Sequence, residues 1–302
     1  MSLHPAVAAT RNAVRACLAG VVGPVFVACS GGADSLALAC ATAFVRPGCG
    51  LVTIDHGLQD GSAAQADAVA AAGRALGCAP VLVRRVSVGR AGGPEAAARS
   101  ARYAALADLD ATVLLGHTLD DQAETVLLGL GRGSGPRSIA GMRPADGRWR
   151  RPFLGLRRTT TEAACAAQGL TPWTDPHNAD CRYRRVRLRS EVVPLLEDVL
   201  AGGVAEALAR TAEQLRDDLD ALDALTPDTD DVAELVALPR ALRTRALKRW
   251  AERVSRPLSA GHVAELDRLV TAWHGQGPID LPGGYRATRR SGRLAILPPM
   301  EG

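Results

Sequence analysis

Lysine is almost missing from this chain. Lys248 is the only lysine among 302 residues, so every other strongly basic side chain is an arginine. A Schiff-base lysine is therefore nearly excluded, and so is the lysine of a G-x-x-x-x-G-K-[ST] phosphate loop, a motif that the chain lacks. Any phosphate site must rely on arginine guanidinium groups or on backbone N–H groups.

Cysteine motifs and long apolar runs are missing as well. The seven cysteines are scattered and none forms a C-x-x-C pair, which predicts reduced thiols and disfavours a zinc or iron–sulfur site. No apolar stretch approaches the roughly 18 residues of a membrane span. Residues 1–20 have the pattern of an amphipathic helix rather than of a signal peptide. We therefore expect a cytoplasmic protein with no membrane partner.

Short apolar runs alternate with alanine-rich helical patterns in the first part of the chain. The runs span 25–30, 50–57, 80–88 and 111–117, and helices are expected near 35–45, 62–77 and 94–109. This alternation predicts an α/β fold, with a parallel, doubly wound (Rossmann-like) sheet covered by helices on both faces. Ligands of such sheets bind at the carboxyl ends of the strands.

The pattern changes near residue 200. Amphipathic, highly charged helices follow, and Ser291-Gly292 between two short strand patterns predicts a β-hairpin close to the end. We place an α/β catalytic domain over 1–200 and a smaller, mainly helical domain over 201–302. Residues 129–153, rich in glycine, arginine and proline, are expected to form loop with an edge strand.

The stretch SGGADS at 30–35 separates the first predicted strand from the first predicted helix of the sheet. Two glycines allow a tight turn that aims N–H groups inward, and the helix N-terminus adds its positive end, so the loop suits an anion. Asp34 would repel phosphate unless Mg²⁺ intervenes, which indicates a metal-bound nucleotide. The alternative is a tight turn in which Ser30 or Asp34 only caps the helix.

The loop resembles the S-G-G-x-D-S motif of the PP-loop ATP pyrophosphatases. The resemblance implies that the loop holds the pyrophosphate end of ATP while AMP is transferred. The residues assigned to ATP lie in this loop and after the second strand: Ser30, Gly31, Gly32, Ala33, Asp34, Ser35, Asp55 and His56.

A second cluster follows the fourth strand. His117, Asp121 and Glu124 are spaced i, i+4 and i+7, which places two carboxylates on one helix face beside an imidazole. Carboxylates in a first turn also stabilise the helix dipole, with Thr118 as cap. Three ionisable groups facing a phosphate loop exceed what a cap needs, so we favour a catalytic role.

A third cluster, Glu95, Arg99 and Arg102, has the same helical spacing. Its simple interpretation is a solvated face with a Glu–Arg pair within the helix, which the spacing alone favours. The other interpretation is an arginine clamp for a phosphate or carboxylate.

The combined motifs resemble bacterial tRNA(Ile)-lysidine synthetase. The matching pieces are SGGADS, IDHGL, PEAAARSARY, GHTLDDQAETVLLGLGRGSG, RPFLGLRR and DPHNADCRYRRVRLRSEVVPLL, in family order over most of 25–200. The resemblance implies that ATP adenylates O2 of the wobble cytidine in the CAU-anticodon isoleucine tRNA. Free lysine then displaces AMP, giving lysidine.

The resemblance also implies residue roles. Asp34 would hold Mg²⁺ with ATP, and Asp34, Asp121, Glu124 and His117 would be catalytic. Free L-lysine would meet Asp121 and Glu124 with its amine and Arg99 or Arg102 with its carboxylate. The oligomeric state stays open, with a homodimer as one option.

Arginine-dense stretches are suited to RNA phosphates. The residues assigned to tRNA are Arg150, Arg151, Arg182, Arg184, Arg185, Arg187 and Arg189. Two alternatives remain at this stage. A PP-loop tRNA cytidine thiolase would usually recruit cysteines for sulfur transfer, and a non-catalytic tRNA-binding module would not need Asp34, Asp121 and Glu124.

Overall fold

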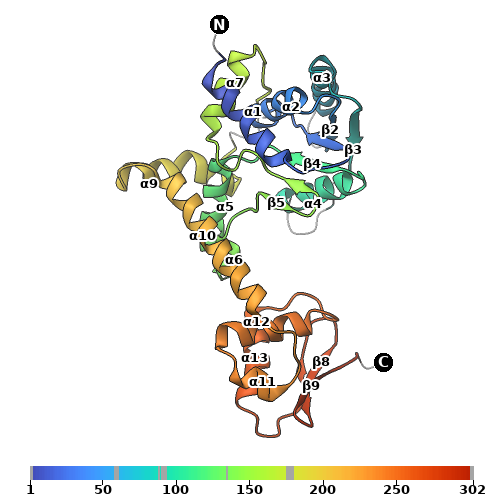
Figure 1. Cartoon of the computed structure of the whole chain (residues 1–302), viewed down its shortest axis with the longest axis vertical. Helices are drawn as coiled ribbons and strands as arrows, with labels where there is room; N and C mark the ends of the chain where they lie inside the picture. Colours follow the sequence, from blue (N-terminus) through green and yellow to red (C-terminus); the bar gives the residue numbers. More distant parts are fainter. Residues whose placement is uncertain are drawn as a thin grey trace. The chain divides into compact units, whose positions relative to one another are not determined.

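The computed structural model describes residues 3–57, 61–87, 89, 94–133, 135–174 and 180–299. The chain divides into two compact units, which Figure 1 colours along the sequence. The first unit comprises 1–131 and 141–212, and the second comprises 132–140 and 213–302. Among the described residues, no helix is both long and apolar enough to cross a membrane.

The first unit is built on a six-stranded sheet in the order β3-β2-β1-β4-β6-β5. All neighbouring strands are parallel except β5 and β6. The bounds are β1 (Val25–Ala28), β2 (Gly50–Asp55), β3 (Val81–Arg85), β4 (Thr112–Leu115), β5 (Ala145–Asp146) and β6 (Trp149–Arg150). The four predicted strands and the edge strand are confirmed, and the strand order reverses between β1 and β4, where such sheets bind ligands.

Alternating side chains of the central strands fill two cores. Val25 and Val27 join one hydrophobic cluster, whereas Phe26 between them joins another, because successive side chains point to opposite faces of a sheet. The first core includes residues of α1 (Pro5–Leu18), α2 (Ala33–Val45), α3 (Ser62–Ala75) and α7 (Arg158–Ala167), and the second includes residues of α4 (Pro94–Ala107). Helices therefore cover both faces, as the sequence predicted.

The remaining helices of the first unit follow the sheet strands or close the unit. They are α5 (Leu119–Arg132), α8 (Arg184–Arg187), the π-helical turn η2 (Leu188–Val192), α9 (Val193–Val199) and the start of α10 (Val204–Leu225). Ala205 on α10 packs in a small core with Leu119 and Ala123 of α5. The first unit therefore needs the beginning of α10.

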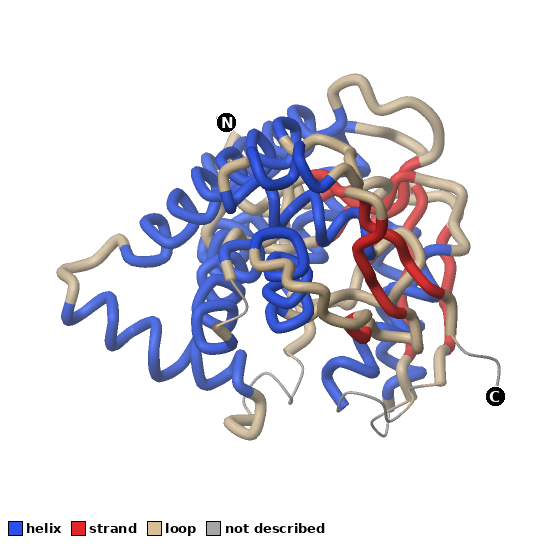
Figure 2. The backbone as a smooth tube through the Cα atoms, turned by 90° about the horizontal axis from the view of Figure 1, so that it is seen from below, coloured by secondary structure: helices blue, strands red, loops and turns tan. Residues whose placement is uncertain are grey.

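The second unit has its own core. Its elements are α6 (Pro136–Ile139), the rest of α10, α11 (Val232–Ala237), α12 (Arg240–Ala251), α13 (Ala260–Thr271), β7 (Ile279–Asp280), β8 (Arg286–Arg290) and β9 (Arg293–Leu297). Leu235, Leu247 and Leu266 are fully buried there. The predicted hairpin is confirmed: Ser291 and Gly292 join β8 to β9 with φ of 48° and 78°, as a type I′ turn requires. Figure 2 distinguishes the helices of the chain from its strands.

Candidate active site

The loop between β1 and α2 needs glycine at one position. Gly31 has φ of +89°, and a Cβ there would lie 2.7 Å from Gln65 Nε2 and 2.8 Å from Val69 Cγ2. Gly32 is the N-cap of α2 and provides no side-chain hydrogen bond to the first turn. The N–H groups at the start of α2 are therefore available to an anion, as the sequence suggested.

Two serines shape this loop. Ser35 is buried, and its hydroxyl accepts a hydrogen bond from the Ser30 amide at 3.1 Å and donates one to the Gly32 carbonyl at 3.0 Å. The Ser30 hydroxyl is exposed and lies 3.2 Å from the Ser35 hydroxyl. Ser35 thus stabilises the turn, whereas the Ser30 side chain remains exposed.

The end of β4 lies directly against the first turn of α2. A Cβ on Gly116 would come within 3.1 Å of the carbonyl carbon and oxygen of Asp34 and the Cα of Ser35. This close approach brings the motif after β4 to the loop after β1. Gly116 lies within the motif GHTLDDQAETVLLGLGRGSG, but its own role was not predictable from the sequence.

Asp34 is held by two residues of α7. Thr161 donates its hydroxyl hydrogen bond to Asp34 Oδ1, and Arg158 Nε donates to Oδ2 at 3.3 Å. Burial raises the pKa of Asp34, while Thr161 and Arg158 act in the opposite direction. The Asp34 side chain keeps 22% of its surface exposed, so the carboxylate remains accessible.

Asp121 serves both a helix cap and an ion pair. Its Oδ2 accepts from the Thr118 amide at 2.8 Å, and the Thr118 hydroxyl accepts from the Asp121 amide, which is a reciprocal cap. Its Oδ1 accepts from Arg158 Nη2 at 2.9 Å. Burial raises the pKa of Asp121, but Arg158, the Thr118 amide, His117 and Arg189 outweigh burial and hold the pKa below its usual value.

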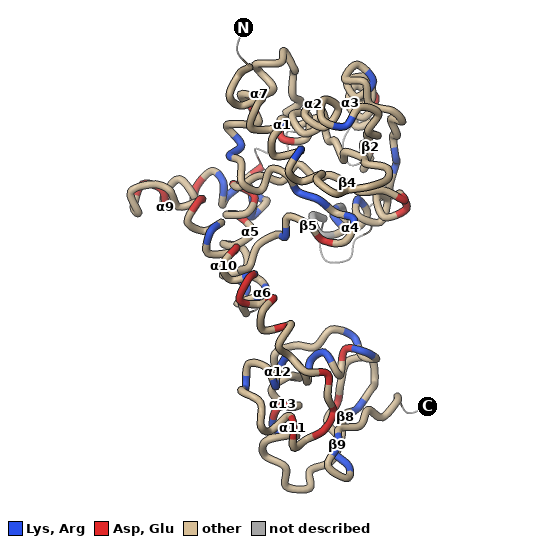
Figure 3. The backbone as a smooth tube through the Cα atoms, viewed as in Figure 1, with Lys and Arg blue, Asp and Glu red and all other residues tan. Residues whose placement is uncertain are grey.

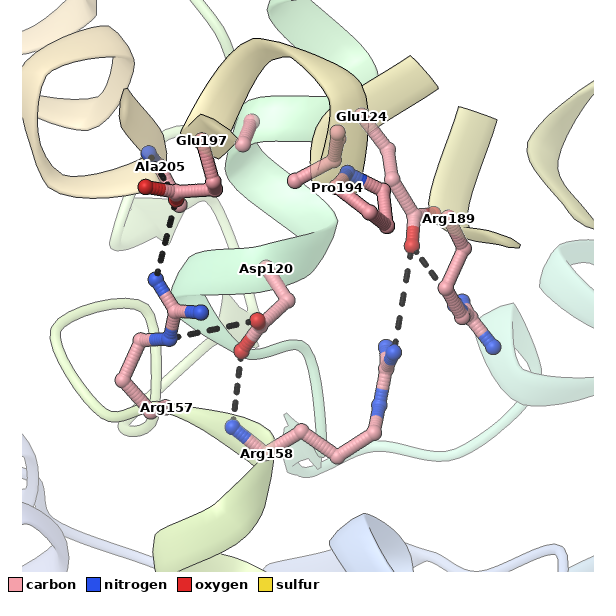
Figure 4. Close-up of a pocket in the computed structure, with 10 residues that line it drawn as sticks. Asp120, Glu124, Arg157, Arg158, Arg189, Pro194, Glu197 and Ala205 are labelled. Atoms are coloured by element: carbon pink, nitrogen blue, oxygen red, sulfur yellow. Dashed lines mark hydrogen bonds and ion pairs between the residues drawn. The ribbon is translucent and has the colours of Figure 1, made fainter. Parts of the chain in front are cut away.

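Glu124 is 1% exposed and is approached by three arginines. Its Oε1 accepts from Arg189 Nε at 2.8 Å and lies 3.9 Å from Arg158 Nη1, as Figure 4 shows. Its Oε2 lies 3.6 Å from Arg185 Nη1 and accepts no hydrogen bond from a described residue. A buried carboxylate requires such compensation.

Arg158 and Thr161 are the site residues that sequence reasoning missed. Arg158 is the first residue of α7, where a positive side chain opposes the helix dipole unless an acid holds it. An arginine at the start of a helix was therefore the feature of the sequence that could have identified Arg158. Arg158 links Asp34, Asp121 and Glu124, although it lies 124 residues from Asp34 in the sequence.

A cavity of about 200 Å³ opens beside Glu124. Arg157 bridges Asp120 and Glu206 on its wall, at 3.3 Å and 3.1 Å, and Glu197 accepts from the Val204 amide at the start of α10. Figure 4 shows Asp120, Arg157 and Glu197 around the opening. The lining residues are Asp120, Ala123, Glu124, Arg157, Arg158, Arg189, Val193, Pro194, Glu197 and Ala205.

His117 is influenced both by Asp121 and by a group of arginines. Burial lowers the pKa of His117 to about 3, and Arg102, Arg151 and Arg99 contribute in the same direction, whereas Asp121 raises it. The imidazole is therefore neutral throughout the physiological pH range. Its Nδ1 is buried and has no hydrogen-bond partner among the described residues.

Asp55 and His56 follow β2, as predicted, but Asp55 is already engaged. It is 3% exposed, accepts from the Gly57 amide at 3.0 Å and pairs with Arg85 at 3.1 Å. His56 is half-buried, its Nδ1 has no described partner, and burial followed by Arg102 lowers its pKa. Both Asp55 carboxylate oxygens are engaged, whereas the Nδ1 atom of His56 accepts no hydrogen bond from a described residue.

The third cluster is described in part. Arg99 is exposed and Arg102 is half-buried, and both guanidinium groups lie near the Tyr103 ring, at 4.9 Å and 5.6 Å from its centroid. The expected Glu95–Arg99 pair lies outside the described side chains. The two interpretations differ in the anion that these arginines contact. It is a glutamate of the same helix for the solvated face, and a phosphate or carboxylate of a ligand for the arginine clamp.

The arginines predicted to bind tRNA occupy three kinds of environment. Arg182, Arg184 and Arg187 are exposed, and the first and last pair with Asp180 and Glu191. Arg150 donates to the Gly147 and Trp149 carbonyls. Arg185 and Arg189 reach Glu124, and Arg151 is 6% exposed. Figure 3 shows that basic and acidic residues occur in both units.

Among the described residues, no three or more histidine, cysteine, aspartate or glutamate side chains are grouped so that they could hold a metal ion by themselves. None of the described cysteines forms a disulfide bond. The sequence profile of the PP-loop domain matches residues 11–196. The U34-tRNA thiolase NcsA from Methanococcus maripaludis has the same fold, with a TM-score of 0.55 and 17% identity over 70% of this chain and 79% of that chain. Sheet, loop and profile together define a PP-loop ATP-binding enzyme.

The tRNA(Ile)-lysidine synthases of Thermobifida fusca and Mycobacterium tuberculosis are 55% and 51% identical to this chain, covering 97% and 89% of it and 98% and 90% of their own lengths. The chain belongs to the tRNA(Ile)-lysidine synthase family of ATP-dependent ligases. Residues 231–295 match the profile of the TilS substrate binding domain. The thiolase likeness is one of fold alone.

Proposed function

We propose that this enzyme joins free lysine to C2 of the wobble cytidine in the CAU-anticodon isoleucine tRNA through an adenylated base. Cytidine O2 attacks the α-phosphorus of ATP and pyrophosphate leaves. The lysine amine, after losing a proton, attacks C2 and AMP leaves. The supporting observation is that Arg158 pairs with Asp34 of the nucleotide loop and with Asp121 and Glu124, which supports assigning both half-reactions to one site.

ATP is assigned to residues 30–35, with Asp55 and His56 at the neighbouring strand end. The open first turn of α2 suits the pyrophosphate end of ATP. Asp34 would hold Mg²⁺, because this ion commonly binds one or two carboxylates together with substrate phosphates. The partly exposed carboxylate beside the loop fits that role. Bound Mg²⁺ would neutralise charge on the leaving pyrophosphate.

Lysine is assigned to the space between the carboxylates and the arginines around His117. Asp121 is ionised and suits the ammonium group, and Glu124 lies one turn further along α5. Arg99 and Arg102 suit the carboxylate of the amino acid. Because His117 is neutral, its imidazole can donate or accept a hydrogen bond with a reacting group without adding charge to the site.

The tRNA is assigned to the arginine-rich surface of the first unit and to the second unit. Arg182, Arg184 and Arg187 are the most accessible candidates, because their guanidinium groups lie on the exposed surface. Arg150, Arg185 and Arg189 remain candidates whose present contacts would have to change on binding. The target base lies in a single-stranded loop and can be extruded at low cost.

Pyrophosphate release in the presence of the isoleucine tRNA and lysine tests this function. Wild type should release pyrophosphate with the CAU tRNA and not with the same tRNA carrying uridine at the wobble position. Asp34→Ala should abolish release while tRNA binding persists, since the arginines assigned to tRNA are other residues. Normal turnover by Asp34→Ala would contradict the assignment of Mg²⁺ and ATP.

A further inference from the structure

Arg151 occupies an unusual position for a residue expected to bind RNA. Its side chain is 6% exposed, and its guanidinium donates to the Arg143 carbonyl at 2.8 Å. Trp149, two residues earlier, packs against Tyr103 of α4 with ring centroids 5.0 Å apart. Residues two apart on an extended chain share a face, so Arg151 points toward the α4 side of the sheet.

Arg102 of α4 and Arg151 approach each other from opposite elements. The positive charges of Arg102 and Arg151 repel each other, and both guanidinium groups lie close to the hydroxyl of Tyr103. The Nε atom of each is buried and has no hydrogen-bond partner among the described residues. Tyr103 also accepts from Arg99 Nη2 at 3.3 Å. A pair of buried donors is thus left open at the same place.

These arginines have no acidic partner within the part of the chain that the structure describes. The contrast with Arg158 is clear, because Arg158 pairs with three carboxylates. Placing like charges together in a buried position without a counter-ion is unfavourable. The arrangement therefore favours binding of an anion from outside the chain.

His117 is close to charges of both signs. Burial lowers its pKa, Arg102, Arg151 and Arg99 lower it further, and Asp121 raises it. A ligand bound beside His117 would therefore lie near positive and negative side chains. A zwitterionic amino acid with a further amine matches this arrangement.

We propose that Arg151, together with Arg102, binds the carboxylate of the free amino-acid substrate, and that Tyr103 positions the two guanidinium groups. Arg151 is then a specificity-determining residue of the active site rather than a contact to the RNA backbone. This inference rests on the proposed lysine-transfer function and extends it by adding a residue to the lysine site.

The test compares L-lysine with 1,5-diaminopentane, which has the same amines and no carboxylate. Wild type should prefer lysine in kcat/KM by about tenfold to a hundredfold, as expected for a charge-assisted contact. Arg151→Met should lower kcat/KM for lysine by that factor and leave the value for the diamine nearly unchanged. Arg151→Lys should restore part of the preference.

Arg84→Met is the matched control. Arg84 also contacts α4, through the Ala105 carbonyl at 3.0 Å, but it has an acidic partner in Asp108 at 3.4 Å. This variant should keep the wild-type preference for lysine over the diamine. Thermal unfolding of each variant reports whether its fold is intact.

Other sources of the anion give different results. If Arg151 binds a phosphate of ATP, Arg151→Met will slow adenylation of the tRNA measured without lysine and leave the lysine-to-diamine ratio intact. If it binds an RNA phosphate, the Kd for tRNA will rise instead. Either result overturns the proposal. A wild type that does not discriminate between lysine and the diamine also overturns it, and this result does not depend on whether Arg151→Met folds. Failure of wild type to attach labelled lysine to the tRNA would instead contradict the proposed function.

Discussion

Glu124 and Asp121 show how much a single residue depends on its neighbours in this site. Each carboxylate is buried or nearly so, and each is compensated by arginines from other elements. Asp121 in addition caps its own helix. The structural and the catalytic interpretations of Asp121 are therefore compatible, because its two oxygens make different contacts.

Asp121→Asn and Glu124→Gln should separate the two half-reactions. Each change keeps the shape of the side chain and removes its negative charge, so the ammonium group of lysine loses an attractive contact. We expect at least one variant to form adenylated tRNA from labelled ATP but to make little lysidine. The KM for lysine should rise about tenfold or more, as follows from about 1.5–3 kcal/mol for a charge-assisted bond.

Gel analysis of the adenylated intermediate measures this separation. If both variants lose adenylation while their dependence on lysine is unaltered, these carboxylates belong to the ATP half of the site. The expectation that they bind the amine would then be wrong.

His117 should make stability depend on pH. Its pKa in the folded enzyme is about 3, below the ordinary value of about 6.5, so the unfolded chain binds the proton more readily. The stability due to this group is present above pH about 6.5 and is lost as the pH falls toward 3, at up to about 1.4 kcal/mol per pH unit. His117→Asn should therefore lose less stability than wild type over that range in urea titrations. Parallel curves for the two proteins would show that His117 is not buried as a neutral group.

The loop between β1 and α2 shows what an element demands of its residues. Gly31→Ala should destabilise the chain and raise the KM for ATP, because the new methyl group meets Gln65 and Val69 and the backbone has positive φ. Gly48→Ala is the control: Gly48 has φ of +79° with no atom near its Cβ position. It should show the backbone cost alone, about 1 kcal/mol, with an unchanged KM for ATP. Equal effects of the two changes on thermal unfolding and on ATP use would contradict a steric requirement at the loop.

At the scale of the whole molecule, tRNA binding should depend steeply on salt. Arg182, Arg184 and Arg187 are exposed and suited to phosphates, and each phosphate contact contributes about −0.7 to −0.9 to the slope of log K against log salt. Changing all three to glutamine should reduce the slope by about 2 to 3. Arg15→Gln combined with Arg74→Gln, at exposed positions on α1 and α3, is the control and should leave it unchanged. An unaltered slope in the triple variant would remove these arginines from the interface.

The two units should divide the work. A chain ending after Ala212 keeps the part of α10 whose Ala205 packs against α5, so the first unit should retain its fold and its affinity for ATP. It should lose most of its affinity for tRNA, because the part that matches the substrate-binding profile is removed. Equilibrium binding of ATP and of tRNA measures both properties. Unchanged tRNA affinity would contradict the proposed role of the second unit.

The sequence by itself determined the elements and the loop. Alternation of apolar strands and helical patterns is a local property, and it predicted the four parallel strands, the helices between them and the Ser291-Gly292 hairpin. The loop at 30–35 was recognisable because its glycines and its position after a strand are needed for the turn itself.

Only the tertiary structure decided which charges meet. Arg158, Arg185 and Arg189 belonged to arginine-dense stretches, and nothing in the spacing of those stretches showed that they reach Asp34, Asp121 and Glu124. Ion pairs between residues 37 to 124 positions apart depend on how α7 and η2 pack around α5 and α2. Only the tertiary structure shows that Arg151 is buried. A guanidinium group is compatible with solvent and with a buried anion site, and the packing of the surrounding elements decides between the two.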